Sequence, residues 1–187
     1  TRVRSSAASD VYKRQSYGGT VLPIEVVMYP SKELVKLTGN LGDVMKESVS
    51  IALGYIKSHA KDLKIDEKLF DSSCIHINAI EGGIPKDGPS AGTALTTAII
   101  SMLLKKSVPN TVAMTGEMTL TGKVLPIGGL KEKSLGAYQA GVNKMFVPKL
   151  NEADLSDIPK EVKDKIEIVL VQNYMDIYND LFKRKKN

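Results

Sequence analysis

Several kinds of residue are scarce in this chain, and each scarcity argues against a class of protein. The 187 residues include one cysteine, Cys74, so no disulfide can form within the chain, which fits a reducing compartment. The sequence has no run of the roughly 20 apolar residues that a membrane span needs. It also begins without the basic and then apolar layout of a secretory signal. We therefore expect a cytoplasmic protein with no membrane partner.

Groups that bind metals or act as bases are also few. There are two histidines, and neither belongs to an H-E-x-x-H motif or to a cluster of ligands, which argues against a metal hydrolase. His59 lies at the polar end of a predicted helix, where a surface role is expected. His76 alternates with Cys74 and Asn78 on a predicted strand, without the order of Asp and His that would suggest a catalytic triad.

The positive charge of the chain lies at its two ends. The formal net charge is +5, but residues 1–15 and 183–187 together contribute +7, so the body of the chain sums to about −2. A protein that binds nucleic acid gathers basic residues on one surface to meet the phosphates. This distribution therefore predicts no nucleic-acid partner for the domain.

Composition predicts one domain with an additional segment at each end. With 42% hydrophobic residues, the chain is long enough for one core and short for two. Residues 1–15 are polar, rich in small residues and without periodicity, so we expect a disordered or non-native N-terminal segment, similar to translated adapter sequence. Residues 16–182 form the expected domain, and residues 183–187 a basic tail.

The order of hydrophobic patterns predicts a mixed α/β fold. Residues 18–29 predict an edge or kinked strand because Pro23 interrupts them, and a turn at residues 30–32 suggests a hairpin with a second strand over 34–37. Alternation and apolar runs predict further strands, and helical periodicity predicts four helices. The strands are expected at 74–80, 112–114, 118–120, 123–125, 144–147 and 166–171, and the helices at 41–59, 90–103, 130–139 and 174–182.

The segment PKDGPSAG, residues 85–92, places a serine where a loop enters a helix. Ser90 lies in the first predicted turn, where backbone N–H groups and the positive end of the helix dipole can stabilise a developing oxyanion. Flanking glycine and proline residues fix the backbone and let a peptide approach closely. The simpler interpretation is that Ser90 only caps the helix, as serine commonly does.

A serine nucleophile needs a base, and a lysine is the candidate because no histidine fits. Lys133 lies three residues after Leu130 and four before Ala137 on a predicted helix, so its side chain leans toward the apolar face, whereas Lys131 points away. A lysine that accepts a proton near neutral pH needs a pKa far below the reference value of about 10.4. The alternative is an ordinary solvated lysine.

Three sequence blocks resemble the signature of the Lon peptidase domain. They are TGNLGDVMKES at 38–48, EGGIPKDGPSAG at 81–92 and MTGEMTLTGKVLPIGGLKEK at 114–133, and they occur in that family's order. The similarity runs from about residue 16 to about residue 182. It implies a single α/β (α+β) domain of the Lon peptidase fold, which is similar to the second domain of ribosomal protein S5.

The resemblance also implies a set of site residues. Ser90 matches the nucleophile and Lys133 the general base of a Ser-Lys dyad. Thr115 matches a residue that orients the lysine. Asp87 and Gly88 match the loop that opens or closes the oxyanion region, and Glu117 matches an acid that shapes the site. Asn78 and Ile80 depart from the histidine and proline of many relatives, so an accessory role for that strand is in doubt.

By the same resemblance, the expected activity is that of a serine endopeptidase. It would hydrolyse unfolded or damaged proteins as a homo-hexamer, coupled to an upstream ATP-driven unfoldase that this chain lacks. No cofactor is expected in this domain: ATP and Mg belong to the upstream module, and Thr121-Gly122-Lys123-Val124 does not complete a phosphate-binding loop. The alternatives are a catalytically silent Lon-like ring or binding module and an S-x-x-K amidase, although Thr93 stands where the latter needs lysine.

Overall fold

The computed structural model describes residues 9–14, 19–80 and 86–183, and within these ranges the side chains from residue 22 onward. Its main sheet has seven strands in the order β3-β4-β2-β1-β5-β8-β9, and β6 pairs with β7 in a second, small sheet. The main strands are β1 Ser9–Arg14, β2 Gly19–Pro30, β3 Val35–Thr38, β4 Ser73–Ala79, β5 Val112–Met114, β8 Lys144–Pro148 and β9 Glu167–Val171. The small sheet is formed by β6 Glu117–Met118 and β7 Val124–Leu125.

Five α-helices and three 3-10 helices accompany these strands in the described residues. The α-helices are α1 Asp43–Ser58, α2 Gly92–Leu104, α3 Leu130–Gln139, α4 Lys160–Lys163 and α5 Tyr174–Phe182. The 3-10 helices are η1 Glu67–Phe70, η2 Pro89–Ala91 and η3 Lys149–Asp157. This mixture in one small domain confirms the predicted α/β fold class. Within the described ranges, no helix has the length and apolar character to cross a bilayer.

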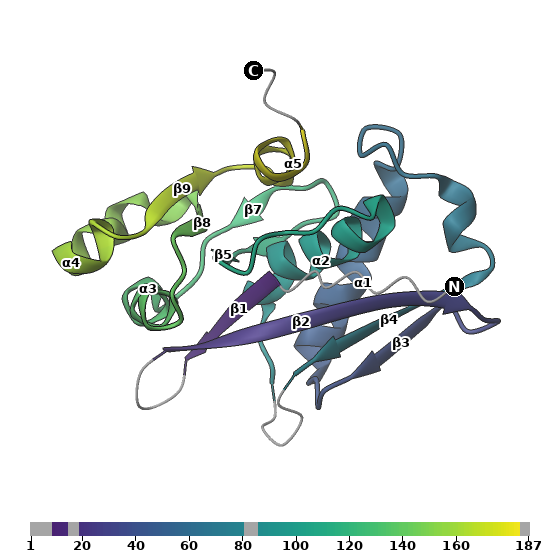
Figure 1. Ribbon diagram of the computed structural model, residues 1–187, viewed down its shortest axis with the longest axis horizontal. Coiled ribbons are helices and arrows are strands. Elements are labelled where there is room, and N and C mark those ends of the chain that lie inside the picture. Colours follow the sequence, from purple (N-terminus) through teal and green to yellow (C-terminus); the bar gives the residue numbers. More distant parts are fainter. Residues whose placement is uncertain (1–8, 15–18, 81–85, 184–187) are drawn as a thin grey trace.

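Two hydrophobic clusters divide the interior. The larger joins α1, α2 and α5 to β2 and β4, and its buried residues include Ile24, Ile77 and Ile99. The smaller joins α3 and α4 to β5 and β8 around Ala137 and Met145. Figure 1 shows α3, α4 and β9 at one end of the molecule, with β3 and β4 toward the other. Because Ser90 precedes α2 and Lys133 lies on α3, the predicted dyad draws one residue from each side of this division.

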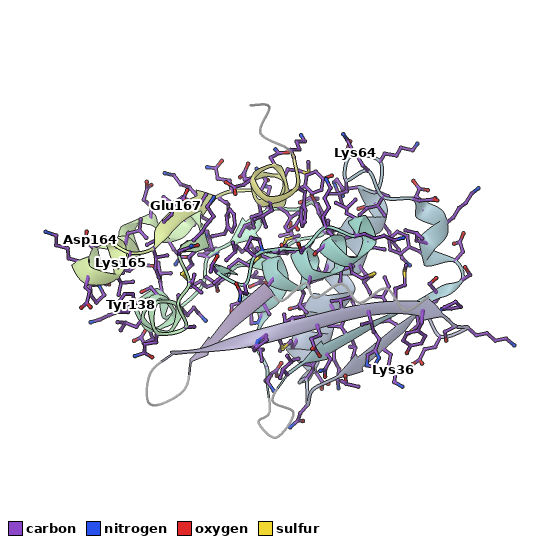
Figure 2. The ribbon with its side chains drawn as sticks, viewed as in Figure 1. Lys36, Lys64, Tyr138, Asp164, Lys165 and Glu167 are labelled. Carbon is purple, nitrogen blue, oxygen red and sulfur yellow. The ribbon has the colours of Figure 1, made fainter. Side chains whose placement is uncertain are left out.

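Charged side chains cover both ends of the molecule. Figure 2 shows Asp164, Lys165 and Glu167 close to one another at the end formed by α4 and β9, where acidic and basic groups are mixed. Lys36 and Lys64 lie at the opposite end. These residues belong to turns, edge strands and the ends of helices, where long charged side chains reach water without burying their charge.

The predicted hairpin of the first two strands is wrong. β3 does not pair with β2; it runs parallel to β4, and β4 lies between them. A parallel pair needs a long crossover, which the chain supplies through α1 between β3 and β4. β2 is also an interior strand rather than an edge strand, with β4 on one side and β1 on the other. Pro23 is tolerated there because the β2–β4 ladder ends at the next residue, where Ile24 pairs with Ala79.

The expectation of disorder over residues 1–15 is wrong for Ser9–Arg14. This segment forms β1, which pairs antiparallel with β2 along its whole length. It also has a parallel bridge from Asp10 to Ala113 of β5. Backbone pairing with strands on both sides fixes this segment although its sequence has no strong strand pattern. Residues 1–8 and 15 lie outside the described residues, and a non-native origin of the segment stays a prediction.

Candidate active site

Ser90 lies in the 3-10 turn η2, directly before helix α2 (Figure 1). The helix begins at Gly92, two residues later than the sequence predicts. Gly88 precedes the turn with φ 140° and ψ 150°, a conformation that favours glycine. Neither η2 nor α2 has a side-chain cap, so Ser90 is not the N-cap of the simpler interpretation. Its side chain is half-buried at the boundary of the protein interior and the solvent.

The backbone of the Ser90 turn is joined to the segment after β5. Gly116 N donates to Ser90 O at 2.9 Å, and Thr93 N donates to Gly116 O at 3.1 Å. The approach is so close that a Cβ on Gly92 would lie 2.8 Å from the backbone nitrogen of Met118. The two glycines therefore let the segments touch through their backbones. As a result, the position of Ser90 is fixed by hydrogen bonds that do not involve its own hydroxyl.

The structure brings two of the supporting residues to this turn. Thr115 is fully buried, and its Oγ1 donates to Ser90 O at 3.4 Å, while its backbone N donates to Phe146 O at 3.1 Å. Glu117 follows two residues later at the start of β6 and is half-buried. Thr115 and Glu117 thus lie on the segment that contacts the Ser90 turn. The predicted role of Thr115 in orienting a lysine stays a prediction.

Asp87 contacts the start of α1 rather than a basic group in the described residues. Its Oδ1 accepts hydrogen bonds from Met45 N at 3.0 Å and from Gly88 N at 3.1 Å. The same stretch of α1 is joined to the loop by its backbone, since Gly42 N donates to Lys86 O at 2.7 Å. Asp87 and Gly88 therefore lie in the loop before Ser90, where the sequence places them, but the contact with α1 was not predicted.

Lys133 lies in the first turn of α3 and is 5% exposed. Lys131, two residues earlier, is exposed. The predicted difference in direction between these two lysines is therefore confirmed. Helix α3 and the turn η2 both contact β1, which places the two parts of the predicted dyad against a common strand. The pairing of the Ser90 and Lys133 side chains stays a prediction.

Two residues near the site were missed from the sequence. Lys86 is buried, and its Nζ donates to Gly39 O at 3.4 Å. Gly42, the N-cap of α1, lies against the side chain of Asp87. Both belong to the blocks that carry the family resemblance, but a glycine or a lysine in a loop gives no local signal of such a contact. Among the described residues, no three His, Cys, Asp or Glu side chains are grouped as a metal site would need.

Comparison with known proteins identifies the family. Residues 11–184 match the family described as Lon protease (S16) C-terminal proteolytic domain. The chain is 54% identical over 166 residues to the Lon protease of Malacoplasma penetrans, a match covering 89% of this chain and 21% of that protein. It is 54% identical over 165 residues to the Lon protease of Mycoplasma genitalium, covering 88% and 21%. The Lon protease of Mesomycoplasma hyopneumoniae is 55% identical over 166 residues, covering 89% and 19%.

The chain spans about a fifth of the length of these relatives. The family match begins at residue 11, inside the segment expected to be non-native, and runs through β1 to the end of α5. It includes the Ser90 turn, the Thr115 segment and the helix that carries Lys133. This chain belongs to the Lon protease (S16) C-terminal proteolytic domain family, and is a protease domain.

Proposed function

We propose that this domain is a serine endopeptidase in which Ser90 is the nucleophile and Lys133 the general base. The observation that carries the proposal is the setting of Ser90. It lies on a turn fixed by backbone bonds to Gly116, and it is not the N-cap residue of η2 or of α2. A hydroxyl whose position is set by the backbone around it is available for attack on a peptide carbonyl.

The burial of Lys133 supports its role as the base. Burial in a medium of low dielectric disfavours the charged form of an amine and so favours the neutral form that can accept a proton. Lys133 is buried although it lies in the first turn of a helix, where lysine is commonly solvated. Its neighbour Lys131 on the same helix is exposed, and so provides an internal comparison.

The proposed reaction has two halves. Ser90 Oγ attacks the carbonyl carbon of the substrate while Lys133 Nζ takes the hydroxyl proton, and the carbonyl oxygen becomes an oxyanion. Backbone N–H groups at the turn and the positive end of the α2 dipole stabilise that charge. The intermediate then collapses to an acyl-enzyme as the leaving amine receives the proton from Lys133. Lys133 then takes a proton from water as that water attacks the ester, and the same proton passes to Ser90 Oγ as the second product is released.

The wider setting is part of the same proposal. We infer that the natural substrates are unfolded or damaged polypeptides, and that an ATP-driven module with its Mg lies in sequence outside this chain. The length of the relatives, about five times that of the matched region, supports a further module. We also propose a cytoplasmic homo-hexamer in which this domain needs no cofactor and contacts neither membrane nor nucleic acid.

The experiment is covalent labelling of the chain with a peptidyl β-lactone, which acylates an activated serine, read by intact mass. We expect one adduct on the wild type, none on Ser90→Ala and far slower labelling of Lys133→Ala. Lys131→Ala is the matched control, because this lysine lies on the same helix but is exposed, and it should label at the wild-type rate. Each variant is first shown to be folded and to have the oligomeric state of the wild type.

The alternative is a catalytically silent Lon-like module that only assembles or binds. It predicts no specific adduct in a folded wild-type sample, or equal labelling of wild type and Ser90→Ala through another nucleophile. Labelling that needs Ser90 but is unchanged in Lys133→Ala would keep the serine peptidase and remove the lysine from it. Cleavage of a fluorogenic peptide by the same variants then assigns turnover to the same residues.

A further inference from the structure

Helix α1 begins without a side chain of its own to cap it. Its N-cap is Gly42, which has none. In most helices the N-cap side chain accepts a hydrogen bond from the second or third backbone N–H of the helix. In α1 the third residue is Met45, and its N–H donates at 3.0 Å to Oδ1 of Asp87. A carboxylate from the loop before Ser90 thus performs the capping that the local sequence does not provide.

The glycine at position 42 leaves the space that Asp87 occupies. A Cβ built on Gly42 would lie 2.4 Å from Cγ, 2.6 Å from Oδ2 and 2.7 Å from Cβ of Asp87. The backbone at Gly42 has φ −72° and ψ 174°, which any residue can adopt. Glycine is therefore needed here for room and not for backbone conformation. The side chain of Asp87 and any side chain at position 42 exclude each other.

Backbone hydrogen bonds also join the start of α1 to the loop before Ser90, at the residue that precedes Asp87. Gly42 N donates to Lys86 O at 2.7 Å, Lys86 N donates to Asn40 O at 3.0 Å, and Leu41 forms a parallel bridge with Lys86. The next residues are Asp87, then Gly88 at φ 140°, then the turn that carries Ser90. The segment before α1 therefore fixes the loop at Lys86, four residues before the proposed nucleophile.

We propose that Gly42 is a positioning residue for Ser90, acting through Asp87. The inference rests on the proposed function of Ser90. With glycine at position 42, Asp87 lies over the first turn of α1, where a negative charge is also favoured by the helix dipole. A side chain at position 42 displaces the carboxylate and, through Gly88, shifts the turn that presents Ser90. A displacement on the order of 1 Å at a reacting group can slow a reaction about 100-fold.

The test is the rate of β-lactone labelling of Ser90 in this chain, with amide hydrogen exchange at Met45 as a second readout. Gly42→Ala is expected to label on the order of 100-fold more slowly and to lose protection at the Met45 amide. Gly54→Ala is the matched control on the same helix, because its new Cβ meets only the far end of Leu120. It should label like the wild type and keep the Met45 amide protected.

Variants of Asp87 separate positioning from a general loss of structure. Asp87→Asn keeps an oxygen that can accept from Met45 N, and should label faster than Asp87→Ala. Asp87→Ala removes the acceptor and should label slowly, and adding Gly42→Ala to it should slow labelling by less than Gly42→Ala does alone, because Cγ and Oδ2 are gone and only the Cβ of residue 87 remains, 2.7 Å from the new Cβ. This pair of Asp87 variants also carries the test if Gly42→Ala does not fold.

The outcomes distinguish this inference from the proposed function. A folded wild type that is not labelled at Ser90 overturns the proposed function, and the positioning role with it. A wild type that labels, together with Gly42→Ala labelling at the same rate, overturns only the positioning role. Equal and additive losses from Gly42→Ala and Asp87→Ala would also overturn it, since they would show that the two residues act independently.

Discussion

Two helices of this domain begin in opposite ways. At α5, Asn173 caps the first turn, and Asp176 Oδ2 accepts from Asn173 N at 3.0 Å, so that both partners lie within four residues. At α1, the cap comes from Asp87, more than forty residues after the helix begins. A local cap stabilises one helix. A distant cap also joins two segments, so a substitution in one segment changes the position of the other.

The largest loss of stability is expected from a substitution at Gly39, just before α1. Its φ is 104°, and an added Cβ would lie 2.1 Å from the carbonyl oxygen of Ala79 in β4. Backbone cannot move aside as a side chain can, so Gly39→Ala should lower the free energy of unfolding by about 3 kcal/mol or more. Gly141→Ala is the control, because it has a similar φ of 77° but open space around the new Cβ.

That control should lose only about 1 to 2 kcal/mol, which is the usual cost of a left-handed backbone for a residue with a Cβ. Urea denaturation of both variants measures the difference. Similar losses of unfolding free energy for Gly39→Ala and Gly141→Ala would show that the close approach to β4 adds no cost. The contrast between distant contacts before α1 and local contacts at α5 would then fail.

The next effect is at the local cap of α5. Asn173→Ala removes the side chain that accepts from the backbone at the third helical residue and should cost about 1 to 2 kcal/mol of unfolding free energy. β-Lactone labelling of Ser90 should stay at the wild-type rate in the folded protein, because this cap joins no second segment. Asn173→Ser retains a capping oxygen and should recover most of the stability. Slower labelling of Asn173→Ala would contradict the distinction between local and distant caps.

The same contrast explains how much the sequence predicts. Helices α3 and α5 were predicted with the observed bounds, because amphipathic spacing and a terminating glycine such as Gly141 are local signals. The partners of β3 and the place of β1 were not, because strand pairing is decided between segments far apart in the chain. Likewise, the family resemblance indicates Ser90 and Thr115, but the contact of Gly42 with Asp87 depends on a space that no local pattern records.

Helix α2 has no side-chain cap, and an unsatisfied hydroxyl lies in its first turn. Among the described residues, Thr93 Oγ1 is buried without a hydrogen-bond partner. Thr93→Val removes that hydroxyl at nearly constant shape and should raise the unfolding free energy by about 1 kcal/mol. Thr97→Val is the opposite case, since Thr97 Oγ1 donates to Thr93 O at 2.8 Å and lies 2.9 Å from Tyr174 Oη. Thr97→Val should therefore have a lower unfolding free energy than the wild type. A higher unfolding free energy in both variants would contradict the difference between a bonded and an unbonded hydroxyl.

The smallest change in unfolding free energy at neutral pH is expected from a substitution at Tyr55, where α1 meets α5. The rings of Tyr55 and Tyr174 lie 5.5 Å apart at 69°. Burial, with a smaller contribution from the Asp62 carboxylate, raises the pKa of Tyr55 from its usual 10.0 to about 12. The folded protein therefore holds this proton more tightly than the unfolded chain does. Its stabilisation is complete below about pH 10 and is lost as the pH rises toward 12.

Tyr55→Phe removes this proton while keeping the ring, so it tests whether the folded state holds the hydroxyl neutral. The unfolding free energy of the wild type should fall more steeply than that of Tyr55→Phe between about pH 10 and 12, while the two proteins differ little at neutral pH. Tyrosinate absorbance gives the titration, and urea denaturation gives the stability at each pH. Parallel curves for the two proteins would show that Tyr55 ionises equally in both states, and that burial does not hold its hydroxyl neutral.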